Sequence, residues 1–85
     1  SAAQMGVRAL TLSLADELRG AGVHVALLIA NGYIATERSP VAEEPEGRSL
    51  HPDDLAAAVA YLAGQSARGW THELVVTPPL EAWTP

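Results

Sequence analysis

The 85-residue sequence contains no cysteine and no phenylalanine. Without cysteine the chain forms no disulfide and no thiolate metal site. Aromatic residues make up only 5% of the chain, so a core would consist of leucine, valine and alanine, which is thin for an independent domain of this size. No hydrophobic run reaches the roughly 20 residues of a membrane span, and no signal peptide is visible. We therefore expect one small domain of a cytoplasmic protein.

The net charge is −5, which argues against nucleic acid and anionic membrane surfaces as partners. The three histidines lack the close spacing of a zinc site, so we expect no metal. The sequence also has no Gly-x-Ser-x-Gly elbow and no phosphate loop of the Gly-Lys-Ser/Thr type. Several common kinds of active site are thereby excluded.

Residues 1–19 have the pattern of a helix with two hydrophobic sides. The main stripe, which we expect to pack on a sheet, consists of Val7, Leu10, Leu14 and Leu18. The second side carries Met5, Ala9 and Leu12, and nothing else in this chain would cover it. Such a helix lies deep inside a larger protein or contacts a partner. The alternative is that Met5 and Leu12 are ordinary scattered surface residues.

The segment 23–30 is almost continuously hydrophobic, which predicts a strand buried on both faces in a parallel sheet. A turn containing Gly32 follows it. Ligands of open parallel sheets bind just beyond the carboxyl ends of the strands. The stretch 30–36 is therefore where we expect a ligand to be met.

The second half of the chain predicts a charged loop over 31–50, a helix over 52–63 and a strand over 73–77. Pro52 suits the first position of a helix, and capping explains Asp53 and Asp54 without a catalytic role. The order helix, strand, helix, strand is typical of α/β architecture with a parallel crossover. Two strands do not make a stable open sheet. We therefore interpret residues 1–85 as the carboxyl-terminal part of a larger α/β domain whose amino-terminal part is missing.

Five stretches with a characteristic order carry a family resemblance. Residues 1–18 resemble the helix after the catalytic tyrosine in the short-chain dehydrogenase/reductase family, and Gly22-Val23-His24-Val25 resembles the entry into its sixth strand. Asn31-Gly32-Tyr33-Ile34-Ala35-Thr36 resembles its Pro-Gly-x-Ile-x-Thr segment. Pro52-Asp53-Asp54-Leu55-Ala56 with Tyr61-Leu62-Ala63 resembles the next helix, and Glu73-Leu74-Val75-Val76 the seventh strand. The resemblance covers nearly the whole chain and is weaker across 37–50.

This resemblance implies a Rossmann-like parallel sheet that binds NAD or NADP and transfers hydride between the nicotinamide and a small carbonyl or alcohol substrate. The family's catalytic serine and tyrosine and its glycine-rich loop all precede the matched region, so the chain holds no catalytic residue and is not expected to be active alone. Gln4 occupies the slot of the family's lysine, whose ammonium holds the ribose and lowers the tyrosine pKa. Glutamine can hydrogen-bond a ribose hydroxyl but brings no charge.

The resemblance also assigns cofactor contacts to Gln4, Asn31, Gly32, Ile34 and Thr36. The backbone of Ile34 would face the nicotinamide carboxamide, and the Thr36 hydroxyl would contact the carboxamide or a phosphate, or cap a helix in the loop. Asn31 replaces the proline of the Pro-Gly pair and tolerates a turn.

Family members commonly pair the first helix with its symmetry mate, which implies a dimer or tetramer. Because of Gln4, the chemistry is weak, or another cation substitutes, or the protein binds without reacting. The alternative function is accordingly a non-catalytic binding or oligomerisation module related to the same family.

Overall fold

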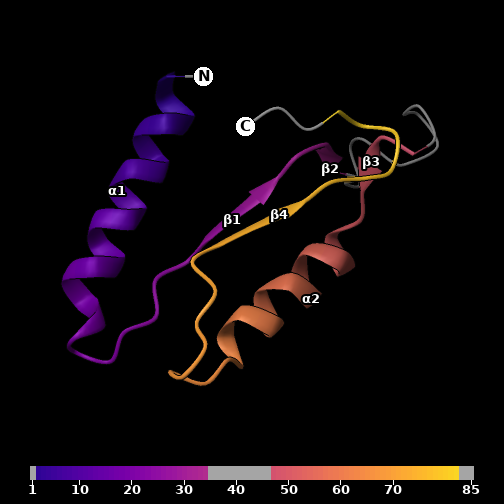
Figure 1. Ribbon diagram of the computed structural model, residues 1–85. Coiled ribbons are helices and arrows are strands. Elements are labelled where there is room, and N and C mark those ends of the chain that lie inside the picture. The colour runs from indigo at the N-terminus through magenta and orange to yellow at the C-terminus, as the bar shows by residue number, and fades with distance from the viewer. Residues whose placement is uncertain (1, 35–46, 83–85) are drawn as a thin grey trace.

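The computed structural model describes residues 2–34 and 47–82 (Figure 1). It is a mixed α/β arrangement in which two helices flank short parallel strands. The elements follow the expected order, with two additional two-residue strands in the middle. They are α1 (Ala2–Arg19), β1 (Leu27–Ala30), β2 (Tyr33–Ile34), β3 (Ser49–Leu50), α2 (Pro52–Ala63) and β4 (Glu73–Val76).

The main sheet consists of β1 and β4, which run parallel with Leu27 opposite Glu73 and Ala30 opposite Val76. A second parallel pair, β2 and β3, continues from the carboxyl end of β1. The polypeptide between β1 and β4 crosses over through α2, as the alternation of elements predicted. The architecture is compatible with part of a Rossmann-like fold.

The predicted strand 23–30 is too long at its amino end, because β1 begins only at Leu27. Its partner β4 begins at Glu73, and the Leu27 amide donates to the carbonyl of His72, so the ladder ends there. Residues 23–26 have no strand beside them in the described ranges and are not part of a ladder. The strand predicted over 73–77 likewise ends at Val76, close to the amide-lacking Pro78.

Helix α2 has the predicted bounds and the predicted start. Pro52 occupies its first turn together with Asp53 and Asp54, while the preceding His51 makes no side-chain capping bond. The helix ends at Gly64, whose amide donates to the Ala60 carbonyl at 3.0 Å. Acidic side chains in a first turn complement the helix dipole, so the two aspartates have a structural explanation.

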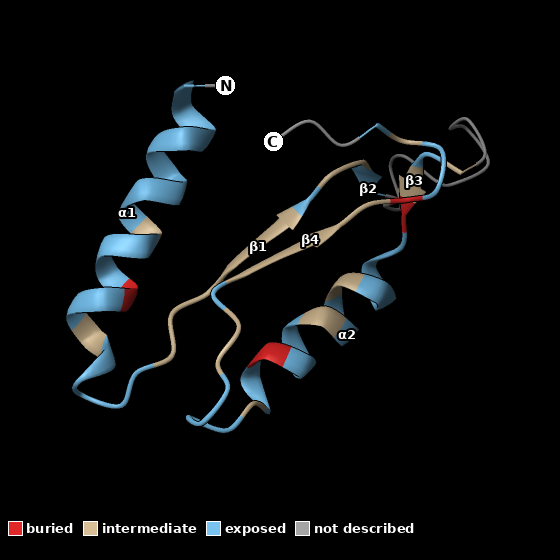
Figure 2. Cartoon of the chain, in the orientation of Figure 1, coloured by how far each residue is buried: buried red, intermediate tan, exposed pale blue. Residues whose placement is uncertain are grey.

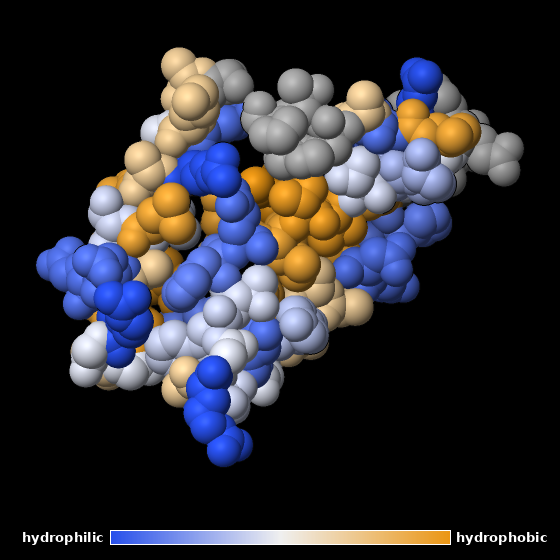
Figure 3. Space-filling model, in the orientation of Figure 1, coloured by the Kyte–Doolittle hydropathy of each residue, from blue (hydrophilic) through white to orange (hydrophobic). Residues whose placement is uncertain are grey.

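The core is small. Within residues 2–34 and 47–82, the buried hydrophobic side chains are Ala15, Leu50 and Leu62 (Figure 2). The expectation that the first strand is buried on both faces is wrong for this chain, since Leu27, Leu28 and Ile29 are half-buried and Ala30 is exposed. Helix α2 packs against β1 and β4, but the sheet is only two strands wide. Hydrophobic surface over the sheet is visible between the helices in Figure 3.

The main stripe of α1 does not pack on the sheet as predicted. Val7, Leu10 and Leu14 are 53%, 62% and 40% exposed. The side of α1 that is covered instead carries Thr11, Ala15 and Leu18, which are buried or half-buried. Helix α1 therefore meets the rest of the described chain along the side that carries these three residues.

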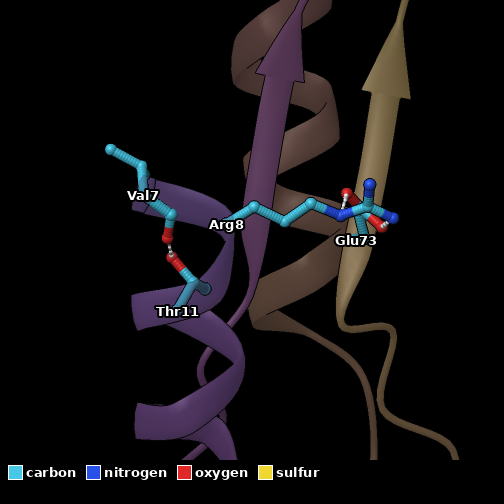
Figure 4. A network of polar contacts seen from close by, with 4 residues as sticks. All are labelled: Val7, Arg8, Thr11 and Glu73. Atoms are coloured by element: carbon cyan, nitrogen blue, oxygen red, sulfur yellow. Dashed lines mark hydrogen bonds and ion pairs between the residues drawn. The ribbon is translucent and has the colours of Figure 1, made fainter. Parts of the chain in front are cut away.

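Arg8 ties α1 to β4. Its guanidinium forms an ion pair with Glu73, with Nε 2.8 Å from Oε1 and Nη2 3.0 Å from Oε2 (Figure 4). The Arg8 side chain remains 52% exposed, so this ion pair lies at the surface of the described structure. In the same turn, the Thr11 hydroxyl donates to the Val7 carbonyl at 2.7 Å.

No helix within the described ranges is long and hydrophobic enough to cross a membrane.

Candidate functional site

The carboxyl end of β1 continues into the segment that the sequence singled out. The Asn31 amide donates to the Val76 carbonyl at 2.9 Å, so the ladder with β4 extends one residue past the strand. A proline at this position could not make that bond because it has no amide hydrogen. Asn31 therefore does more here than tolerate a turn, and its amide pairs the end of β1 with the end of β4.

Gly32 lies where another part of the backbone passes very close. A Cβ atom at this position would lie 2.8 and 2.9 Å from the Cδ and Cγ atoms of Pro78, and 3.2 Å from the Arg48 carbonyl oxygen. Cβ contacts under 3.0 Å force neighbouring atoms to shift. Gly32 is thus required because three segments meet here: the one after β1, the one before β3 and the one after β4.

Beyond Gly32 the chain pairs with β3. The Tyr33 amide donates to the Arg48 carbonyl at 3.2 Å, and Tyr33 and Ile34 lie opposite Ser49 and Leu50. Successive residues of a strand direct their backbone groups to opposite edges. Because Tyr33 directs its amide toward β3, Ile34 directs its amide and carbonyl to the other edge, away from β3. The Ile34 side chain is 40% exposed.

The predicted cofactor contacts are thus partly brought together. Asn31, Gly32 and Ile34 form one continuous turn and strand at the carboxyl end of the sheet. Gln4 lies in the exposed first turn of α1. Because α1 runs antiparallel to β1, the amino-terminal end of α1 and the carboxyl end of β1 lie at the same end of the fold (Figure 1). Thr36 lies outside the described residues, as does most of the predicted loop.

The structure adds residues that the sequence did not single out. Pro78 is buried against Gly32, and the side-chain amide of Asn31 donates to the Ala82 carbonyl at 2.9 Å. Ser49 has a buried hydroxyl oxygen with no hydrogen-bond partner in the described part of the chain. The Pro78-Pro79 pair is visible in the sequence and is typical of the end of a strand, but no local pattern indicates that Pro78 contacts Gly32.

Histidines that are distant in sequence meet at the opposite, amino-terminal end of the sheet. The His24 ring stacks on Trp70 with centroids 4.8 Å apart and lies edge-on to His72 at 6.4 Å. His24 Nε2 is 2.7 Å from the Thr71 carbonyl oxygen, so that nitrogen carries the proton and donates it. No group of three metal-binding side chains occurs among the residues that the structure describes.

A shallow groove of about 530 Å³ lies beside this cluster, between β1 and α2. Its polar contributors already have partners: Gln65 Nε2 donates to the Thr71 hydroxyl at 2.8 Å, and Gln65 Oε1 accepts from the Thr71 amide at 2.8 Å. His24 is similarly engaged. The amino-terminal end therefore has the features of a structural joint, and the candidate site is the carboxyl end.

Comparison with known proteins gives one match of limited extent. A protein of Methylorubrum extorquens described as an uncharacterized oxidoreductase is 36% identical over 75 residues, which cover 73% of this chain and 30% of that protein. The chain thus spans less than a third of the relative's length. No protein-family model matches the chain. No solved structure matches it either.

Proposed function

We propose that this chain is the carboxyl-terminal part of an NAD(P)-dependent oxidoreductase related to the short-chain dehydrogenases and reductases. The observation that carries the proposal is the segment Asn31–Ile34, which leaves the carboxyl end of a parallel strand at the position where open α/β sheets bind ligands. The relative that is described as an oxidoreductase supports the same reaction class. The substrate would be a small carbonyl or alcohol compound.

The residues present fit a nicotinamide cofactor at this edge. Ile34 directs a backbone donor and a backbone acceptor away from β3, which matches the two hydrogen-bonding groups of a carboxamide. Close packing of Gly32 on Pro78 and the Arg48 carbonyl fixes the turn that presents them. When bound, the nicotinamide would supply or accept the hydride.

The other proposed contacts extend this role of binding and orientation. Gln4 would hydrogen-bond a ribose hydroxyl from the first turn of α1, and Thr36 would hold the carboxamide or a phosphate. None of these residues would move a proton. Gln4 carries no charge, and this observation keeps the second candidate function, a non-catalytic binding or oligomerisation module, in consideration.

Cofactor titration of the full-length protein tests the proposal. We expect NADH or NADPH to bind the wild type, as followed by nucleotide fluorescence. Gly32→Ala should weaken binding by roughly tenfold or more, because the added Cβ would be 2.8 Å from Pro78 and displace the turn. Gly69→Ala is the matched control, since a Cβ there meets nothing within 4 Å.

Melting temperatures of both variants show whether each still folds. Wild-type protein that binds neither nucleotide contradicts the proposed function. Equal cofactor affinities in the wild type and in a folded Gly32→Ala variant would show that cofactor binding does not depend on the turn at Gly32.

We further propose that the full-length protein is a homo-oligomer that pairs through α1. Met5 and Leu12 are 72% and 49% exposed on one side of this helix. A two-fold contact repeats the same surface on both subunits, so Leu12→Glu would place two unpaired carboxylates at one interface. We expect this variant to shift the protein toward monomer in light scattering, with cofactor binding retained.

Ser13→Glu is the control for the oligomer prediction, because it adds the same charge at the neighbouring exposed position of α1, outside the Met5 and Leu12 side. It should leave the oligomer mass unchanged. If Leu12→Glu also leaves the mass unchanged, this side of α1 is ordinary surface and the proposed contact is wrong.

A further inference from the structure

The polypeptide that follows β4 folds back over the candidate site. We define the tail as residues 78–82. It starts at Pro78, whose ring lies against Gly32. It continues through Leu80, whose amide donates to the Gly47 carbonyl at 2.8 Å, and reaches Ala82, whose carbonyl accepts from the Asn31 side chain at 2.9 Å. The tail is therefore held at three points by residues on both sides of the site.

The middle contact is tightly packed as well as hydrogen-bonded. Gly47 has a φ of 81°, and a Cβ there would lie 2.7 Å from both Cγ and Cδ1 of Leu80. Only glycine adopts this conformation readily and leaves room for the leucine. Gly47 comes just before β3, so this contact anchors the tail beside the strand that pairs with Ile34.

The outer contact depends on the side chain of Asn31. Its backbone amide is already used to bond Val76, and the side-chain amide supplies the second bond, to Ala82. One residue thus holds both the end of β4 and the end of the tail. A residue without a side-chain donor at position 31 would leave the Ala82 carbonyl without this partner.

Exposed hydrophobic side chains accompany the tail at this end. Tyr33, Ile34 and Leu80 are 51%, 40% and 64% exposed. They lie on β2 and on the tail, on either side of the contacts just described. A ligand that meets the backbone of Ile34 would therefore also meet hydrophobic surface.

We propose that Asn31 is a positioning residue that latches the tail across the carboxyl end of β1, so that the tail forms one wall of the substrate site and favours carbonyl compounds with a hydrophobic substituent. The wall rests on the proposed oxidoreductase function. The latch itself does not, because it is a contact within the chain. The two parts are therefore tested by separate measurements on the full-length protein.

Hydrogen exchange tests the latch without any cofactor. Asn31→Asp keeps the size of the side chain but replaces the donor with a carboxylate that repels the Ala82 carbonyl. We expect the tail amides of Leu80 and Glu81 to exchange roughly threefold to tenfold faster in this variant. Gly47→Ala should give the same change from the other side, because its Cβ would displace Leu80.

Ala67→Asp is the control, since it adds the same charge on an exposed turn outside the candidate site. It should leave tail exchange unchanged. Wild-type exchange rates in both folded latch variants would overturn the latch, whatever the protein's activity.

Steady-state kinetics test the wall. With methyl ketones of increasing alkyl length as substrates, both latch variants should raise KM for the longer ketones by roughly threefold to tenfold. In Gly47→Ala the KM for acetone and the kcat values should change little. Gly47→Ala is the more informative variant in this assay, because Gly47, unlike Asn31, is not a proposed cofactor contact.

The outcomes separate the two proposals. Faster tail exchange with an unchanged ratio of KM values between long and short ketones would support the latch and overturn the wall. If the wild type binds neither NADH nor NADPH and reduces no ketone, the proposed function fails and the wall fails with it. The exchange measurement still decides the latch in that case.

Discussion

Gln4→Lys in the full-length protein is expected to raise carbonyl reduction by roughly tenfold to a hundredfold, provided that a tyrosine precedes Ser1. A free tyrosine has a pKa of about 10, and each unit by which a nearby ammonium lowers that pKa corresponds to about 1.4 kcal/mol. Gln4 lies in the exposed first turn of α1, which points toward the same end of the fold as the carboxyl end of β1 (Figure 1). A lysine at position 4 has the length and charge to restore this effect.

The pH dependence gives a second readout of the Gln4→Lys variant. In alcohol oxidation the tyrosinate would accept the proton, so a lower tyrosine pKa makes the base available at lower pH. We therefore expect the rise of the oxidation rate to move to lower pH in the variant. If the lysine acted only by unfolding the helix or weakening the cofactor site, the oxidation rate would fall without this rise moving to lower pH.

Two controls isolate the charge at position 4. Gln4→Met keeps the length without a cation and should not raise turnover. Ala3→Lys adds the same ammonium one position earlier, on a different side of the helix, and should have little effect. Unchanged turnover and an unchanged pH profile in Gln4→Lys, with equal cofactor affinity, would contradict the tyrosine argument and favour the non-catalytic module.

The isolated chain of residues 1–85 is expected to lack a cooperative unfolding transition at low concentration. Its radius of gyration is 14.8 Å, against about 12 Å for a compact domain of this length. In the described ranges only Ala15, Leu50 and Leu62 are buried hydrophobic residues, and the main sheet has two strands. So little buried hydrophobic surface does not offset the conformational entropy of ordering the chain.

Calorimetry and near-ultraviolet circular dichroism of the isolated chain would check this expectation. We expect a broad, low-enthalpy change and weak signals from Trp70. The full-length protein is the control and should unfold sharply. A dilute monomer of residues 1–85 with a sharp two-state transition would show that the small core is sufficient.

The sequence was most informative where a residue type restricts the backbone. Pro52 indicated where α2 begins, and Gly32 marked the turn after the first strand. Each of these restrictions is local, so a single sequence reveals it. The order of elements and the parallel pairing also followed from local pattern, because a helix between two hydrophobic runs implies a crossover.

What the sequence did not reveal depends on contacts between distant segments. The main stripe of α1 has a clear helical period, yet a period cannot say how wide the sheet beneath it is. The pairing of Arg8 with Glu73, the stacking of His24 on Trp70 and the contact of Asn31 with Ala82 each join residues more than 40 positions apart. Ordinary residue types make these contacts, so no local signal announced them.

The β1–β4 pair is joined at both ends, which has a mechanical consequence. At one end the His24 ring holds the Thr71 carbonyl, and at the other the Asn31 amide holds Val76. Because β1 and β4 are hydrogen-bonded beyond both ends of their ladder, these two strands are less free to shift relative to each other than α1 is relative to them. Helix α1 is attached through the turn at Gly22, where φ is 77°, and through the half-exposed Arg8 ion pair. We therefore expect the angle between α1 and the strand pair to change more readily than the register of β1 on β4.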